Sequence, residues 1–338
     1  MSTSLRLAAT VMALGVSLAT QALCEAPDRL RISGPSIHQN IAVFLVHGTS
    51  DGRPVPLILQ DAMPEQQVRV TETGTVNELT IENLSDQEIF VQAGEIVTGG
   101  KQDRVISSNL ILPPHSGRIS MAAFCVEPGR WVAREGQDGH SFTVATRSMP
   151  TSGTNWVMVA AASGRSAVTR AAQSQVWEDG RRTRSSLERQ LHADPSTSTS
   201  LASTLETGLL EQAAGQFSEI LAPPGLDAQD VVGYVFAING HPVSGEIFAS
   251  NALLRKLWPK LARGAIVDAI AARPENMGAA VPSQDVIARF LAPPQADGVQ
   301  GQRLTEYTTQ NVFHDDDRLL IETRRADGSW VAKMYQAK

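Results

Sequence analysis

The chain has only two cysteines in 338 residues, Cys24 and Cys125, so neither a disulfide framework nor a cysteine-based metal site can organise its fold. Basic residues are also few: 29 Lys and Arg stand against 35 Asp and Glu, a balance that argues against a general nucleic-acid binder. Only 5% of the residues are aromatic. However, 42% of the residues are hydrophobic, a fraction that is ordinary for a folded globular protein. The neighbours of Cys125, Phe124 and Val126, favour a buried thiol over a reactive one.

The N-terminus lacks an apolar run long enough for a membrane-spanning helix. Arg6 is the only charge before the apolar run 7–19, whose length of about 13 residues is short of the roughly 20 that span a bilayer. Small residues near Ala22 allow cleavage there or just after Cys24. We therefore expect residues 1–24 to be a signal peptide and the mature protein to be periplasmic or secreted, without a permanent membrane anchor.

The common motifs of metal and nucleotide chemistry are missing too. The 7 histidines are scattered without zinc-site spacing, and no dinucleotide-binding fingerprint occurs. Residues 94–101 resemble a phosphate loop, but the Lys comes one position late and Gln102 replaces the Ser or Thr that binds Mg²⁺. Residues 48–52 have the spacing of a nucleophile elbow, yet two prolines follow where a helix is needed, so we expect a hairpin turn. We predict no cofactor and no metal site.

The region 25–160 is rich in short runs of period two separated by glycine and proline, a pattern typical of strands. One or two helical turns are expected near residues 56–63. The expected strands cover residues 41–46, 68–71, 78–82, 88–92, 105–112 and 118–126. We expect these strands to form a sandwich-like or barrel-like sheet.

The region 161–338 mixes helices with a small sheet. Expected helices cover 166–188, a segment ending near 217, the apolar stretch 253–261 and 283–291. Pro259 is expected to begin a new helical segment because it has no N–H to donate in a helix interior. Expected strands cover 231–238, a short run after Asn239-Gly240, 307–313, 318–322 and 330–335. The fold class is therefore α+β, with the two regions packed as one unit.

Two polar runs, 95–104 and 124–131, place charged residues beside glycine pairs and strand ends. If the strand ends lie side by side, carboxylates there offer acid or base groups while cations and an amide hold an anion and an aromatic ring stacks. The catalytic candidates are Glu95, Asp103 and Glu127. The ligand-binding candidates are Lys101, Gln102, Arg104, Arg130 and Trp131. The alternative interpretation is a turn tied together by salt bridges, and the sequence leaves both open.

These two runs, together with 76–79, 175–177 and 233–261, resemble the ARG-and-rhodanese-phosphatase-superfamily-associated domain family, a domain of unknown function. The resemblance covers most of the chain beyond residue 24 and is sharpest over 94–104 and 125–131. It implies an association with ADP-ribosylglycohydrolase-type and phosphatase-type proteins, and hence a role in handling NAD-derived or ADP-ribose-like molecules. It transfers no catalytic residue.

Three functions remain open at this point. The leading hypothesis is an exported protein that binds a small anionic ligand of the nucleotide or ADP-ribose type. The first alternative is a non-catalytic envelope module that binds a protein partner. The second alternative is a hydrolase of an ADP-ribose-type bond, which requires Glu95 and Glu127 to face one cleft. The sequence does not establish whether the protein is an enzyme.

Overall fold

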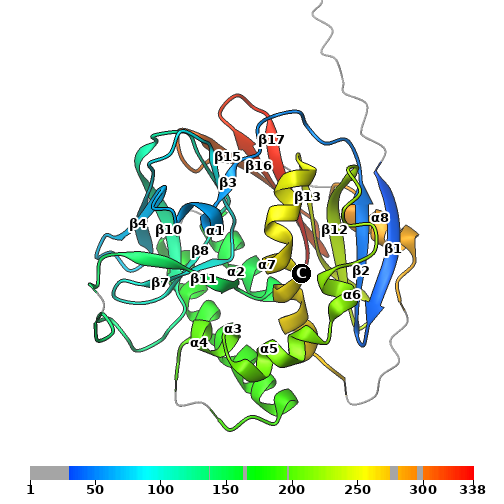
Figure 1. Ribbon diagram of the computed structural model, residues 1–338, viewed down its shortest axis with the longest axis horizontal. Helices are drawn as coiled ribbons and strands as arrows, with labels where there is room; N and C mark the ends of the chain where they lie inside the picture. The colour runs from blue at the N-terminus through cyan, green and yellow to red at the C-terminus, as the bar shows by residue number, and fades with distance from the viewer. Residues whose placement is uncertain (1–29, 137, 163–165, 196–197, 275–280, 295–299) are drawn as a thin grey trace, which may run out of the picture.

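The computed structural model describes residues 30–338 except 137, 163–165, 196–197, 275–280 and 295–299 (Figure 1). The expected signal peptide, residues 1–24, lies outside the described residues. No helix within the described part is long and apolar enough to cross a membrane. The strands are β1 (Arg31–His38), β2 (Ile41–His47), β3 (Leu57–Ile58), β4 (Val68–Glu72), β5 (Glu78–Asn83), β6 (Ile89–Val91), β7 (Glu95–Gly99), β8 (Arg104–Ile106), β9 (Leu110–Leu112), β10 (Gly117–Cys125), β11 (Phe142–Ser148), β12 (Val231–Ile238), β13 (His241–Phe248), β14 (Gln300–Arg303), β15 (Thr308–His314), β16 (Arg318–Arg325) and β17 (Trp330–Ala337). The helices are α1 (Leu59–Ala62), α2 (Thr151–Ala162), α3 (Ser166–Leu191), α4 (Leu201–Leu205), α5 (Gly208–Gly215), α6 (Ser218–Leu221), α7 (Asn251–Ala271) and α8 (Gln284–Leu291).

The α+β class is confirmed, with a β-rich N-terminal half and helices in the C-terminal half. The N-terminal half carries a six-stranded sheet in the order β11-β7-β8-β10-β5-β4 and a three-stranded sheet in the order β3-β6-β9. Strand β5 shows why the sequence pattern works: Leu79, Ile81 and Asn83 are buried while their neighbours are half-buried, which is the alternation of a sheet with one face on a core.

The single strand expected over residues 105–112 is wrong, because the chain forms β8 and β9 in two different sheets. Between them, Asn109 accepts a hydrogen bond from the Ala93 backbone N–H at 2.8 Å and donates to Thr323 at 3.1 Å. These side-chain hydrogen bonds hold the chain where it passes from the six-stranded to the three-stranded sheet. The spacing of apolar residues does not predict such bonds.

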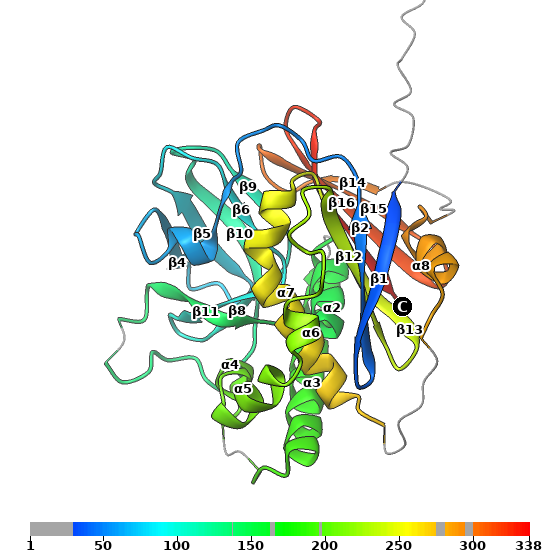
Figure 2. The ribbon, with the colours of Figure 1, turned by 45° about the vertical axis from the view of Figure 1, so that its right-hand side comes forward.

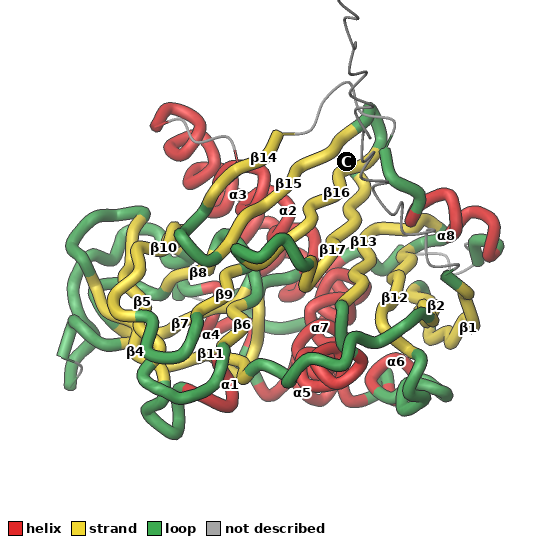
Figure 3. Tube along the Cα trace, turned by 90° about the horizontal axis from the view of Figure 1, so that it is seen from above, coloured by secondary structure: helices red, strands yellow, loops and turns green. Residues whose placement is uncertain are grey.

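An eight-stranded sheet, β1-β2-β12-β13-β17-β16-β15-β14, joins the two halves of the chain. Viewed from above, it curves around α7 (Figure 3). Strand β2 is buried at every position and lies between β1 and β12, so it forms a continuous apolar run in the interior of the sheet. The loop after β2 crosses to β3 in another sheet, so the hairpin turn expected at 48–52 is wrong. There Ser50 accepts from the Asn251 N–H at 3.0 Å and so satisfies the first turn of α7.

Helix α7 runs through the centre of the molecule between the N-terminal sheets and the curved sheet (Figures 1 and 2). It continues through Pro259, so the expected break there is wrong. The missing N–H costs about 3 kcal/mol, but α7 buries Leu254, Leu257 and Trp258 around that turn. Each such side chain contributes roughly 1.5–3 kcal/mol on burial, which outweighs the cost of the proline.

Candidate functional site

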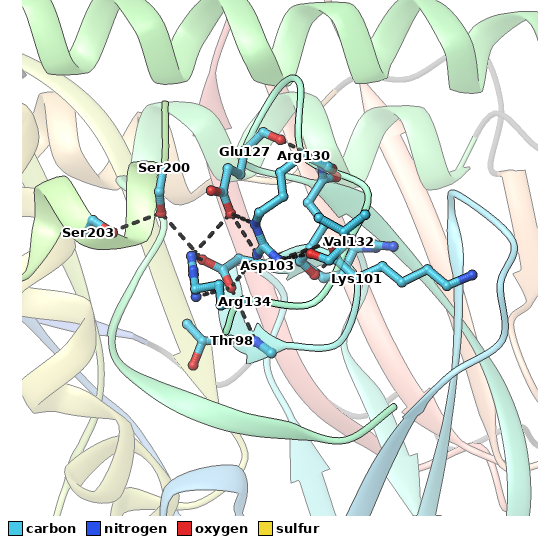
Figure 4. Close-up of polar contacts among 12 residues, drawn as sticks. Thr98, Lys101, Asp103, Glu127, Arg130, Val132, Arg134, Ser200 and Ser203 are labelled. Atoms are coloured by element: carbon cyan, nitrogen blue, oxygen red, sulfur yellow. Dashed lines mark hydrogen bonds and ion pairs between the residues drawn. The ribbon is translucent and has the colours of Figure 1, made fainter. Parts of the chain in front are cut away.

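The two polar runs lie side by side. Gly99 and Gly100 have φ values of 131° and 51°, and a side chain at either position would collide with Ser141 or Phe142. This tight turn brings residues 101–104 back beside β10, where Arg104 is registered against Cys125. The chain from 125 to 134 therefore covers the turn between β7 and β8, and the charged side chains of both runs meet there (Figure 4).

Asp103 is the centre of this cluster and is fully buried. Its carboxylate accepts from Arg134 Nη1 at 3.1 Å and from Nη2 at 2.6 Å, a bidentate pair. It also accepts from the Gly99 N–H at 3.2 Å and from Ser200 Oγ at 3.3 Å (Figure 4). Arg130 approaches it at 3.5 Å. With these donors around it, Asp103 is a structural anion and has no free lone pair for a substrate.

Glu127 and Arg130 are committed in the same way. Glu127 accepts from Arg130 Nε at 2.7 Å and from Arg134 Nη2 at 3.1 Å. Arg130 Nη1 donates to the carbonyl oxygens of Lys101 at 3.0 Å and Val132 at 2.6 Å. The amide of Gln102 donates to the carbonyls of Glu127 and Arg130. We call these four charged residues, Asp103, Glu127, Arg130 and Arg134, the paired network; its formal charge is zero.

Arg104 is buried completely and pairs with Glu72 at 3.2 Å. Its Nη1 donates to the Gln102 carbonyl at 2.9 Å, so it is turned inward and cannot hold a ligand. Burial raises the pKa of the neighbouring Cys125 thiol to about 11, with Arg104 opposing the rise. Cys125 is therefore a buried, protonated thiol at neutral pH, as the flanking apolar residues indicated.

Lys101 and Trp131 differ from the rest of the predicted set because they reach the surface. Trp131 is 37% exposed, and the Lys101 Nζ lies 5.5 Å from its ring centroid. The guanidinium of Arg104 lies 5.0 Å from the same ring. Among the described residues no carboxylate lies within ion-pair distance of Lys101, and its side chain points away from the paired network (Figure 4). The cluster therefore leaves one cation and one aromatic ring available.

Glu95 lies elsewhere. Glu95 is the first residue of β7, and the turn that carries Asp103 begins after the last residue of that strand, Gly99. At the rise of an extended strand, Glu95 and Gly99 are about 13 Å apart. Glu95 is 2% exposed and lines a small cavity with Lys260 and Glu246. Burial raises its pKa, and the charge of Lys260 opposes the rise. Glu95 and Glu127 therefore do not face one cleft, which is the condition that the hydrolase hypothesis set.

Arg134, Glu246 and Lys260 belong to these clusters but were not predicted from the sequence. Arg134 lies three residues beyond Trp131, and only its long-range bond to Asp103 shows its role. The burial of Lys260 could have been predicted, because it follows Leu257 by three positions and therefore lies on the same buried face of α7. In the part of the chain that the structure describes, no group of three His, Cys, Asp or Glu side chains is placed to hold a metal ion.

The fold and the site define an α+β protein whose two halves share one curved sheet and whose strand-end charges are paired around the buried carboxylate of Asp103. The family model of the ARG and Rhodanese-Phosphatase-superfamily-associated Protein domain matches residues 29–335, so the chain belongs to that family. No curated protein and no solved structure matches the chain.

Proposed function

We propose that this protein is an exported binding protein that takes a small anionic ligand of the nucleotide or ADP-ribose type on the surface formed by Lys101 and Trp131. We call these two residues the Trp131 platform. The observation that carries the proposal is that the paired network holds an exposed tryptophan beside a lysine for which no described carboxylate lies within ion-pair distance.

The platform is pre-organised. The residue before Trp131 is fixed by Gln102, which donates to the Arg130 carbonyl, and the residue after it is fixed by Arg130, which donates to the Val132 carbonyl at 2.6 Å. A ring whose backbone is held on both sides loses little conformational freedom when a ligand stacks on it. Exposed tryptophan is also a residue type enriched where proteins bind other molecules.

The chemistry of the platform suits a base joined to phosphate. Stacking of a base on an aromatic side chain is worth about 1–3 kcal/mol, and every base offers a face for it. The Lys101 ammonium supplies a single positive charge for a phosphate oxygen. Two contacts of this size imply a dissociation constant nearer 1 mM than 1 nM, as expected for a ligand bound on a surface.

The direct test is calorimetric titration of the mature protein with ADP-ribose, NAD, nucleotides and sugar phosphates. The proposal requires saturable heat with at least one of them. A folded protein that gives no heat with any of these ligands contradicts it.

A second candidate, the envelope interaction module, is favoured by the exposure of Val132, which is 67% exposed beside Trp131. Two adjacent apolar side chains at the surface suit a protein partner as well as a base. In this case Arg104→Ala and Glu95→Gln lower the melting temperature, because each disturbs a buried charge, while small-molecule binding is absent in every variant. The titration above separates the two candidates.

A further inference from the structure

Glu95 and Lys260 face a narrow cavity of about 20 Å³ between β7, β13 and α7. This is space for about one water-sized group. Glu95 is 2% exposed and Lys260 is 8% exposed, yet neither carboxylate oxygen of Glu95 nor the Nζ of Lys260 has a hydrogen-bond partner among the described residues. Gln60 lies close enough to Glu95 for its amide to lower the Glu95 pKa, although no hydrogen bond of normal geometry joins the two side chains in the described part of the chain. Buried charged groups of this kind are costly, so their retention needs an explanation.

Glu246, which also lines the cavity, is fixed by hydrogen bonds. Glu246 accepts from the Tyr234 hydroxyl at 2.8 Å and from Gln92 Nε2 at 3.0 Å, so its carboxylate is held in place. Gln336 also lines the cavity, and its Oε1 has no hydrogen-bond partner among the residues that the structure describes. On the outer side, the charges of Arg147 and Glu206 act on Lys260 in opposite directions. The cavity therefore offers acceptor oxygens on Glu95 and Gln336, and its donors include the Lys260 ammonium and the hydroxyls of Ser148 and Thr151.

A wider groove of about 530 Å³ lies next to the cavity. Thr151 lines both spaces. Gly264 lines the cavity, and Asp268, one turn later on α7, lines the groove. Helices α2, α3 and α7 lie together in this part of the molecule (Figure 2). A volume of this size lies in the range of small-molecule sites.

The polar side chains of the groove include Thr183, Ser186 and His241, together with Ser152 and Asn239, which already donate to Asp268 and to the Ala272 carbonyl. Arg182 is already paired with Glu178 at 2.9 Å, and Asp268 is an acid on the same wall. An anionic ligand would meet Asp268 and the carboxylates of the cavity, and a cationic ligand would meet Lys260. A hydroxyl group both donates and accepts, so it satisfies Glu95 and Lys260 together without adding charge.

We propose that the cavity and groove form a second site, separate from the Trp131 platform, for a small neutral polyhydroxylated molecule such as a sugar. One terminal hydroxyl enters the cavity, donates to Glu95 and accepts from Lys260. The remaining hydroxyls contact the side chains of the groove. The ligand thereby supplies the hydrogen bonds that both buried charges lack.

Saturation-transfer NMR with glycerol, D-ribose, D-glucose and myo-inositol tests this site. We expect saturable binding of at least one of them by the wild-type protein, weakened at least about tenfold by Lys260→Met and by Glu95→Gln. Lys256→Met is the matched control, because Lys256 lies one turn earlier on α7 and pairs with Asp61 at the surface. Trp131→Ala should bind these probes as the wild type does.

A variant on the surface keeps the test valid if the buried substitutions unfold the protein. Thr183→Trp places a large side chain in the groove from a half-buried position on α3 and leaves the cavity untouched. We expect it to fold with an unchanged melting temperature and to lose the sugar signal. Absence of saturable binding by the wild type overturns the proposal, and so does binding that Thr183→Trp leaves intact.

Discussion

Arg134 donates from both Nη1 and Nη2 to the buried carboxylate of Asp103, across 31 positions of sequence. This pair fastens the loop that follows β10 to the turn between β7 and β8. The pair engages the Asp103 carboxylate, which the sequence suggested as a catalytic group, and it fixes the loop that carries Trp131. The same contact thus explains why Asp103 is unavailable and why Trp131 is well placed.

Asp103→Asn should destabilise the protein by about 3–5 kcal/mol, because it leaves the cations of the network without their buried anion. Urea unfolding of the variant measures this loss. Asp227→Asn is the control, since the Asp227 side chain is 90% exposed and should change stability by less than about 0.5 kcal/mol. In a cycle with Arg134→Met, the two losses should be strongly non-additive. Additive losses would show that the pair is not the unit described here.

Glu246 gives a prediction for pH. Burial raises its pKa to about 7, with hydrogen bonds from Tyr234 and Gln92 opposing the rise. Because the folded-state pKa is above the unfolded value of 4.5, the folded protein favours the protonated acid. The resulting stabilisation is complete below pH 4.5 and is lost as the pH rises through 7, a change of about 3 kcal/mol.

Glu246→Gln cannot titrate, so its stability relative to the wild type should increase between about pH 4.5 and pH 8. Taking the difference between the two proteins removes the contribution of other groups, including Asp268, whose pKa burial raises to about 6. Guanidinium unfolding at a series of pH values measures the difference. A difference that stays constant over this range means that Glu246 titrates normally.

Cys125 should be unreactive in the folded protein, because its thiol is buried and has a pKa of about 11. In a Cys24→Ser variant, a thiol reagent at pH 8 should label the native protein only as fast as it unfolds. Full labelling should follow immediately in denaturant. Rapid labelling of one thiol in the native protein would place Cys125 at the surface.

Export is tested on the N-terminus itself. We expect the protein recovered outside the cytoplasm to begin after a position between residues 20 and 24. Intact-mass spectrometry measures this start directly. Recovery of the full-length chain in the cytoplasm alone would contradict the proposal of an exported protein.

The pattern of apolar residues predicted the strands well where buried side chains alternate regularly or form an unbroken run. The alternation in β5 and the uniform apolar run of β2 are both legible in the sequence. Pro259 shows the limit, because a local rule for proline gives way to the burial of the helix around it. The split between β8 and β9 depends on a partner far along the chain, because Asn109 between them donates to Thr323.

The position of the charged cluster could be predicted from the sequence, but its ion pairs could not. The two polar runs do lie together, as expected if the strand ends were adjacent. The choice of ion-pair partners depends on tertiary structure and could not be predicted from the sequence. Arg104 pairs with Glu72 and Asp103 with Arg134, while no described carboxylate lies within ion-pair distance of Lys101. Glu95 belongs to another part of the molecule because a strand separates it from the turn, and Lys260, whose charge acts on Glu95, comes from α7.

The central claim is that Lys101 and Trp131 hold the ligand, and a second lysine–tryptophan pair in the same chain provides the control. Lys333 lies 4.9 Å from the ring of Trp330, on β17 and away from the paired network. Calorimetric titration with ADP-ribose should show affinity reduced about tenfold or more in Trp131→Ala and Lys101→Ala. It should be unchanged in Trp330→Ala and Lys333→Ala. Equal affinity in all four variants would contradict the account.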